Sequence, residues 1–129
     1  MIVVDASALV AIAQAEPEEV AFLAVLQESD RAWLSPINYV ETGLILARRK
    51  IIPDQQRLER WLASVNVSVS EGVELGSLAL DAYLRYGKGF HPAHLNLADC
   101  FAYALAKQLD LPLLYQGDDF AKTDIRPAI

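Results

Sequence analysis

The sequence predicts a three-layer α/β/α domain, in which helices cover both faces of a mostly parallel central sheet of four to five strands. Short apolar or β-branched runs alternate with longer helical segments along the whole chain. The 129 residues suffice for one domain, and they contain no internal repeat, low-complexity segment or linker. We therefore treat residues 1–129 as a single domain.

The amino-terminal third is expected to form two strands and two helices. The β-branched residues 2–4 are typical of a buried strand, and the polar side chains in residues 5–7 can cap a helix over residues 8–15. A second helix is expected over residues 17–28, because proline suits a first turn and two glutamates follow near its positive end. Residues 31–35 (RAWLS) form the second expected strand.

The middle of the chain is expected to add two helices and a strand. Pro36 opens a helix over residues 37–50, whose last turn is basic, as the helix dipole favours. A further helix is expected over residues 53–64. The alternating pattern VNVSVS at residues 65–70 predicts the third strand.

The last third is expected to complete the sheet. We expect a helix over residues 71–86, a loop over residues 87–92 and an alanine-rich helix over residues 96–109. The apolar residues 113–115 predict the fourth strand, and Ile125 begins a short last one.

Acidic residues occupy positions that such a fold brings together. Asp5 follows the first expected strand, and Asp118 and Asp119 follow the fourth. Ligands of parallel sheets bind at the carboxyl ends of the strands. Asp99 lies in the first turn of its helix and Glu41 one turn into another, so all these positions can converge.

Each acid also has a purely structural explanation. Asp5 is a good helix cap, and Asp99 can complete a capping box with Asn96. Glu41, like most helical glutamates, can lie on the surface. The Asp118–Asp119 pair can belong to a turn or cap the short segment that follows. The combination, rather than any single acid, favours a site.

Four carboxylates in one pocket repel one another, and divalent cations would offset that repulsion. With one cysteine and two histidines in the chain, an oxygen-only ligand set favours Mg²⁺ or Mn²⁺. Such ions activate water and stabilise charge on phosphate oxygens, which is the chemistry of phosphodiester hydrolysis. The single cysteine also excludes an internal disulfide and a cysteine-based zinc site.

The net charge of −6 argues against a protein that holds nucleic acid by bulk charge. Basic residues nevertheless cluster, and a local basic surface beside the carboxylates is expected to contact RNA. The alternative is that these residues only stabilise helix ends or solvate helices. The candidates are Arg48, Arg49, Lys50, Arg85 and Lys88.

Four segments resemble a known family: IVVDASALVAI, SPINYVETGLIL, DAYLRYGKGFHPAHLNLADCFAYALAK and PLLYQGDDFAKTDI. They resemble PIN-domain ribonucleases, and specifically the VapC toxins of bacterial VapBC toxin–antitoxin pairs. The resemblance covers essentially the whole chain. It implies a PIN-like fold and a metal-dependent endoribonuclease that uses Mg²⁺ or Mn²⁺.

The resemblance also implies roles for the acids. Asp5, Glu41 and Asp99 match the first three acidic residues of the PIN site, with Asp5 and Asp99 as direct metal ligands. The fourth acid is Asp118 or Asp119. The commoner PIN pattern places Thr or Ser two positions before this acid, and the sequence YQG supplies neither. We favour Asp118 as the third metal ligand, because it directly follows the glycine at the strand end.

The family implies partners as well: a second copy in a homodimer, a VapB-type antitoxin whose carboxyl-terminal segment covers the site, and a structured RNA such as a tRNA or rRNA loop. We expect a cytoplasmic protein, since no apolar run reaches the roughly 18 residues of a membrane span. One alternative is a catalytically weak PIN-like dimer that acts mainly as partner of its antitoxin. A phosphoacceptor receiver domain is disfavoured, because VNVSVSEG places no aspartate at its strand end.

Overall fold

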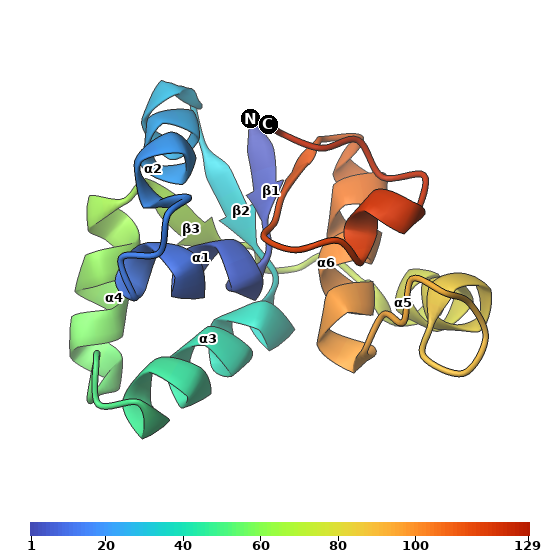
Figure 1. Cartoon of the computed structure of the whole chain (residues 1–129), viewed down its shortest axis with the longest axis horizontal. Coiled ribbons are helices and arrows are strands. Elements are labelled where there is room, and N and C mark those ends of the chain that lie inside the picture. Colours follow the sequence, from blue (N-terminus) through green and yellow to red (C-terminus); the bar gives the residue numbers. More distant parts are fainter.

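The computed structural model describes residues 1–129 and builds them around a four-stranded sheet in the order β3-β2-β1-β4 (Figure 1). Every neighbouring pair of strands is parallel. This confirms the predicted fold class, with four strands. The strands are β1 (Ile2–Val4), β2 (Ala32–Leu34), β3 (Val67–Val69) and β4 (Leu113–Leu114).

No strand forms at Ile125, where a short fifth one was expected. The carboxyl-terminal segment instead makes an isolated bridge between Leu113 and Pro127. The Leu113 N–H donates to the carbonyl of Arg126, and the Ala128 N–H donates to the carbonyl of Leu113, both at 2.9 Å. Pro127 is tolerated at this point because the bonds to Leu113 are made by its neighbours, so the N–H that proline lacks is not needed.

All six expected helices form, with ends that differ from those expected by up to five residues, and the start of α5 differs most. α2 begins after a turn that contains Ala15 in the left-handed region, at φ 54°. α5 begins after Gly72, whose φ of 74° cannot continue a right-handed helix. The helices are α1 (Ala6–Ala13), α2 (Glu19–Glu28), α3 (Pro36–Arg48), α4 (Gln55–Ser64), α5 (Gly76–Tyr86) and α6 (Leu97–Leu109), followed by a 3₁₀ turn, Phe120–Lys122.

β3 is also shorter than predicted, because Asn66 adopts a left-handed conformation with φ 67° immediately before it. The Asn66 side-chain amide donates to the carbonyls of Leu26 and Ser29, at 3.0 and 2.8 Å. These bonds tie the start of β3 to the end of α2. The residue therefore ends the preceding helix rather than opening the strand.

Two hydrophobic cores follow from the alternation of side chains along β1. Ile2 and Val4 pack on one face with residues of α1 to α4, whereas Val3 packs on the other with residues of α5 and α6. Figure 1 shows the same division, with α5 and α6 on one side of the sheet. Val3 and Val4 are fully buried, and each such side chain contributes roughly 1.5–3 kcal/mol.

The chain termini lie together at one end of the strands, and α1 and α3 begin at the opposite, carboxyl end (Figure 1). β1 leads directly into α1 through Asp5, and β2 leads into α3 through Ser35. The carboxyl ends of the strands are therefore surrounded by the first turns of helices. No helix of the protein has the length and apolar character needed to cross a membrane.

Gly87 lies at the end of α5, where the backbone leaves no room for a side chain. Its N–H donates to the Tyr83 carbonyl at 2.7 Å, and a Cβ at this position would lie 2.3 Å from that oxygen. We predict that Gly87→Ala lowers the free energy of unfolding by about 2 kcal/mol, measured by urea denaturation. Gly76→Ala is the matched control, since a Cβ there meets nothing within 4 Å. Equal urea midpoints for the two variants would contradict the prediction.

Candidate active site

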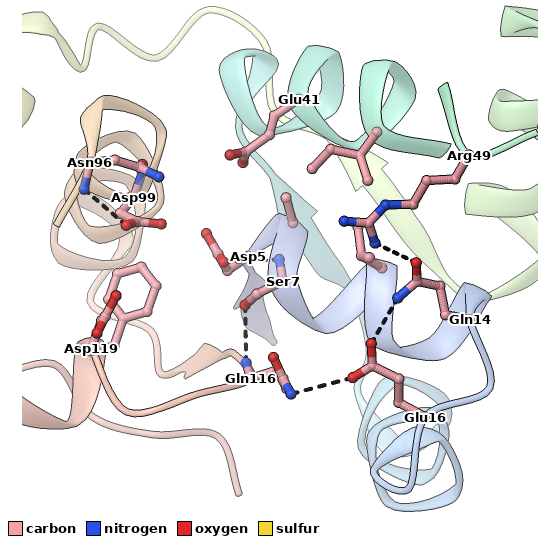
Figure 2. A pocket seen from close by; sticks show the side chains of 14 residues that line it. Asp5, Ser7, Gln14, Glu16, Glu41, Arg49, Asn96, Asp99, Gln116 and Asp119 are labelled. Atoms are coloured by element: carbon pink, nitrogen blue, oxygen red, sulfur yellow. Dashed lines mark hydrogen bonds between the residues drawn. The ribbon is translucent and has the colours of Figure 1, made fainter. Parts of the chain in front are cut away.

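A polar pocket opens at the carboxyl ends of the strands, between α1, α3, α6 and the loop after β4 (Figure 2). It collects acidic side chains from five separate parts of the sequence. Four of them, Asp5, Glu41, Asp99 and Asp119, are among the acids predicted from the sequence, and Glu16 is not. The acids that line the pocket are Asp5, Glu16, Glu41, Asp99 and Asp119.

Asp5 both caps a helix and presents an unpartnered oxygen. Its Oδ2 accepts from the Ser7 N–H at 3.0 Å, as expected for the N-cap of α1. Its Oδ1 is buried and has no hydrogen-bond partner. Burial raises the pKa of Asp5 to about 6, and the charge of Glu41 adds a smaller increase. The capping role explains only one of the two oxygens.

Asp99 completes the predicted capping box at the start of α6. Its N–H donates to Asn96 Oδ1 at 2.8 Å, and its Oδ2 accepts from the Asn96 N–H at 2.9 Å. Burial raises the pKa of Asp99 to about 7, with a further increase from the charge of Asp5. As with Asp5, one oxygen serves the backbone, and the pocket holds the carboxylate close to like charges.

Glu41 approaches the pocket from α3 and is held by Asn38, one turn earlier. The Asn38 amide Nδ2 donates to Glu41 Oε1 at 3.3 Å and to the carbonyl of Ala98 in α6 at 3.1 Å. Burial is the main cause that raises the pKa of Glu41, and the charge of Asp99 adds to it. Asn38, which is fully buried, therefore links two walls of the pocket.

Asn38 was not among the predicted site residues. Its spacing of three residues from Glu41 places the two side chains on one helix face, and that spacing was the available signal. The contact with α6 joins segments 60 residues apart in the sequence, and no local pattern indicates it.

Of the two aspartates after β4, Asp119 lines the pocket and Asp118 does not. Both are exposed. Gly117, with φ 98°, reverses the chain just before them, and Asp119 leads directly into the 3₁₀ turn. This placement favours Asp119 as the fourth acid, opposite to the preference drawn from the sequence.

The basic residues predicted to contact RNA also differ in whether they line the acidic pocket. Arg49 lines the acidic pocket, whereas Arg48 is exposed outside it. Arg85 lies 3.6 Å from Asp81 on the same helix. Lys88 lines a different, mostly apolar hollow beside α5. The structure thus brings one of the predicted RNA-binding residues to the acids.

The donor set of the pocket suits a hard divalent cation. All the acids supply oxygen, and Oδ1 of Asp5 is a buried acceptor without a donor. Cys100, next to Asp99, is an unsuitable ligand, because burial raises its thiol pKa to about 11. As they stand, no three Asp, Glu, His or Cys side chains are grouped closely enough to hold an ion.

Comparison with known proteins places this geometry in a family context. A family model described as PIN domain matches residues 2–126. The VapC ribonuclease Mb0640 of Mycobacterium bovis is 40% identical over 124 residues, which cover 95% of each chain. Ribonuclease VapC42 of Mycobacterium tuberculosis is 40% identical over 128 residues, which cover 98% of each chain.

A solved structure has the same fold. It is the crystal structure of Mycobacterium tuberculosis VapC20, described as a Sarcin-Ricin loop cleaving toxin. The two structures superpose with a TM-score of 0.69 at 18% identity, over 98% of this chain and 100% of the other.

The buried charge of Asp5 makes stability depend on pH. Asp5 has a pKa of about 6 in the folded protein against an ordinary value of 3.8, so the folded state loses stability as pH rises from about 4 to above 6. Asparagine can keep the cap without the charge. We predict that Asp5→Asn raises the free energy of unfolding at pH 8 by about 2 kcal/mol in EDTA.

Chemical denaturation of both proteins at pH 4 and pH 8 measures this difference. Glu41 and Asp99, the carboxylates whose charges interact with Asp5, are the same in both proteins. The advantage of the variant should vanish near pH 4, where Asp5 is protonated in the folded wild type. A wild type as stable as the variant at pH 8 contradicts the prediction.

Proposed function

This chain belongs to the PIN-domain family, among the VapC ribonucleases, and we propose that it is a metal-dependent endoribonuclease toxin that hydrolyses phosphodiester bonds in a structured RNA. The observation that carries the proposal is the buried, unpartnered Oδ1 of Asp5 in a pocket with three further acids of the predicted set. An isolated buried charge costs several kcal/mol of stability, so its retention favours a role in binding a cation.

Asp5, Asp99 and Asp119 would hold Mg²⁺ or Mn²⁺, with Asp119 preferred to Asp118 because it lines the pocket. A bound ion would lower the pKa of an attacking water and offset charge on the phosphate. Asp5 and Asp99 each use one oxygen for a helix cap, which fixes their orientation and leaves the other oxygen for the ion.

Glu41 is suited to accept a proton from the attacking water. Its Oε1 is engaged by Asn38, which leaves Oε2 as the acceptor. Burial and the neighbouring Asp99 raise its pKa above its ordinary value, which makes the carboxylate a better base. Asn38 holds the carboxylate in place, because it is itself anchored to α6.

The partners follow from the family. We propose a VapB-type antitoxin that silences the site, a homodimeric state and a cytoplasmic location. The substrate proposed is a structured RNA, a tRNA or an rRNA, since VapC20 of Mycobacterium tuberculosis is described as cleaving the Sarcin-Ricin loop. The complete acid set disfavours the alternative of a catalytically weak dimer.

Cleavage of total RNA in Mg²⁺ tests the proposal and separates the two aspartates after β4. We predict that Asp99→Asn, which can keep the capping box, lowers the rate by at least about 100-fold. Asp119→Asn should lower it about tenfold or more, and Asp118→Asn less than about threefold, since only Asp119 lines the pocket.

Circular dichroism checks that each variant remains folded, and EDTA should abolish wild-type cleavage. Wild-type rates for Asp99→Asn would refute the proposed mechanism. A larger loss for Asp118→Asn than for Asp119→Asn would restore the preference drawn from the sequence.

A further inference from the structure

A chain of side-chain hydrogen bonds runs along the wall of the pocket that faces α6 (Figure 2). Gln116 Nε2 donates to Glu16 Oε2 at 3.3 Å, and Gln14 Nε2 donates to Glu16 Oε1 at 2.7 Å. The Arg49 guanidinium then donates to Gln14 Oε1. The chain joins α1, the turn after α1, the end of α3 and the loop after β4.

Arg49 is the only basic side chain that lines the acidic pocket. It lies at the C-cap of α3 and is exposed. Its one side-chain partner, Gln14, is neutral, so its positive charge is not cancelled by a direct ion pair. An arginine presents five N–H donors, and a single bond leaves the others available to a ligand.

Glu16 determines which way the Gln14 amide points. A carboxylate only accepts, so Gln14 must turn its Nε2 toward Glu16. Its Oε1 is then directed to Arg49. The second oxygen of Glu16 accepts from Gln116, so both oxygens of this acid are engaged.

The same chain is anchored to the acidic end of the pocket. The Gln116 N–H donates to Ser7 Oγ at 3.0 Å, and the Ser7 N–H donates to Asp5. A continuous set of contacts therefore connects the buried carboxylate of Asp5 with the guanidinium of Arg49. Such networks hold side chains in one geometry more firmly than single bonds do.

We propose that Arg49 binds a backbone phosphate of the RNA at the edge of the pocket, and that Gln14, Glu16 and Gln116 are positioning residues that hold it there. The inference rests on the proposed function. An RNA strand that enters a pocket with five acids needs a cation on its wall, and guanidinium matches phosphate by paired hydrogen bonds. The placement also explains how a chain of net charge −6 contacts RNA locally.

Binding of labelled bulk tRNA, followed by fluorescence anisotropy in Mg²⁺, tests the role of Arg49. All variants carry Asp99→Asn, so that the RNA stays intact. Arg49→Ala should weaken binding about tenfold and reduce the slope of log Kd against log salt by about one. Arg60→Ala, which removes the same charge from the exposed face of α4, is the matched control. Equal affinities and equal slopes for these two variants overturn the assignment of Arg49.

The direction in which Glu16→Gln changes RNA affinity separates a positioning role from a bulk electrostatic effect. Loss of an acid from the pocket should strengthen RNA binding if only charge matters. If Glu16 orients Gln14 and Arg49, the variant should instead bind about threefold more weakly, with the salt slope unchanged. Glu28→Gln, at an exposed acid of α2, controls for the loss of charge. Tighter binding by Glu16→Gln overturns the positioning role.

The outcomes distinguish this inference from the proposed function. If the wild type cleaves RNA and Arg49→Ala leaves affinity unchanged, only the inference fails. If the wild type neither cleaves nor binds RNA, both fail. In the Asp99-intact protein, Arg49→Ala should raise KM for RNA more than it lowers kcat, because binding rather than chemistry is impaired.

Discussion

Asp5 carries a carboxylate into the interior at the point where β1 ends and α1 begins. Its N–H pairs with the Leu114 carbonyl of β4, so the strand pairing itself determines its position. Ser7 satisfies one carboxylate oxygen, and nothing satisfies the other. Asparagine or serine would cap the helix without the cost of a buried charge. Helix capping therefore does not account for the buried charge, whereas the proposed cation site does.

The other parts of the site depend on this charge. Asp99 and Glu41 are each held by an asparagine, which keeps them near Asp5 against electrostatic repulsion. Both have raised pKa values, chiefly through burial. Arg49 lines the pocket on its other side, tethered through neutral glutamine rather than through an acid. Without a ligand the pocket works against stability, as functional sites often do.

The sequence predicted the features that follow from local patterns, such as the alternation of strands and helices and the residues that cap the helices. Alternating strands and helices indicated a parallel sheet, and parallel strands imply that acids at their ends converge. Features that depend on single backbone angles or distant contacts were missed. Left-handed Asn66 shortened β3, and the turn at Gly117 brought Asp119 to the pocket in place of Asp118. The bond from Gln116 to Glu16 spans 100 residues, and no periodicity reveals such a pair.

Thermal unfolding in a Mn²⁺ titration tests most directly whether the pocket of Asp5 binds a divalent cation. A ligand that binds only the folded state stabilises it by RT ln(1 + [L]/Kd), or about 2.7 kcal/mol at 100 times Kd. We predict a Tm that rises by several degrees with Mn²⁺ in the wild type and stays constant in Asp5→Asn. A wild-type Tm that does not change at millimolar Mn²⁺, or an equal rise in both proteins, would contradict this prediction.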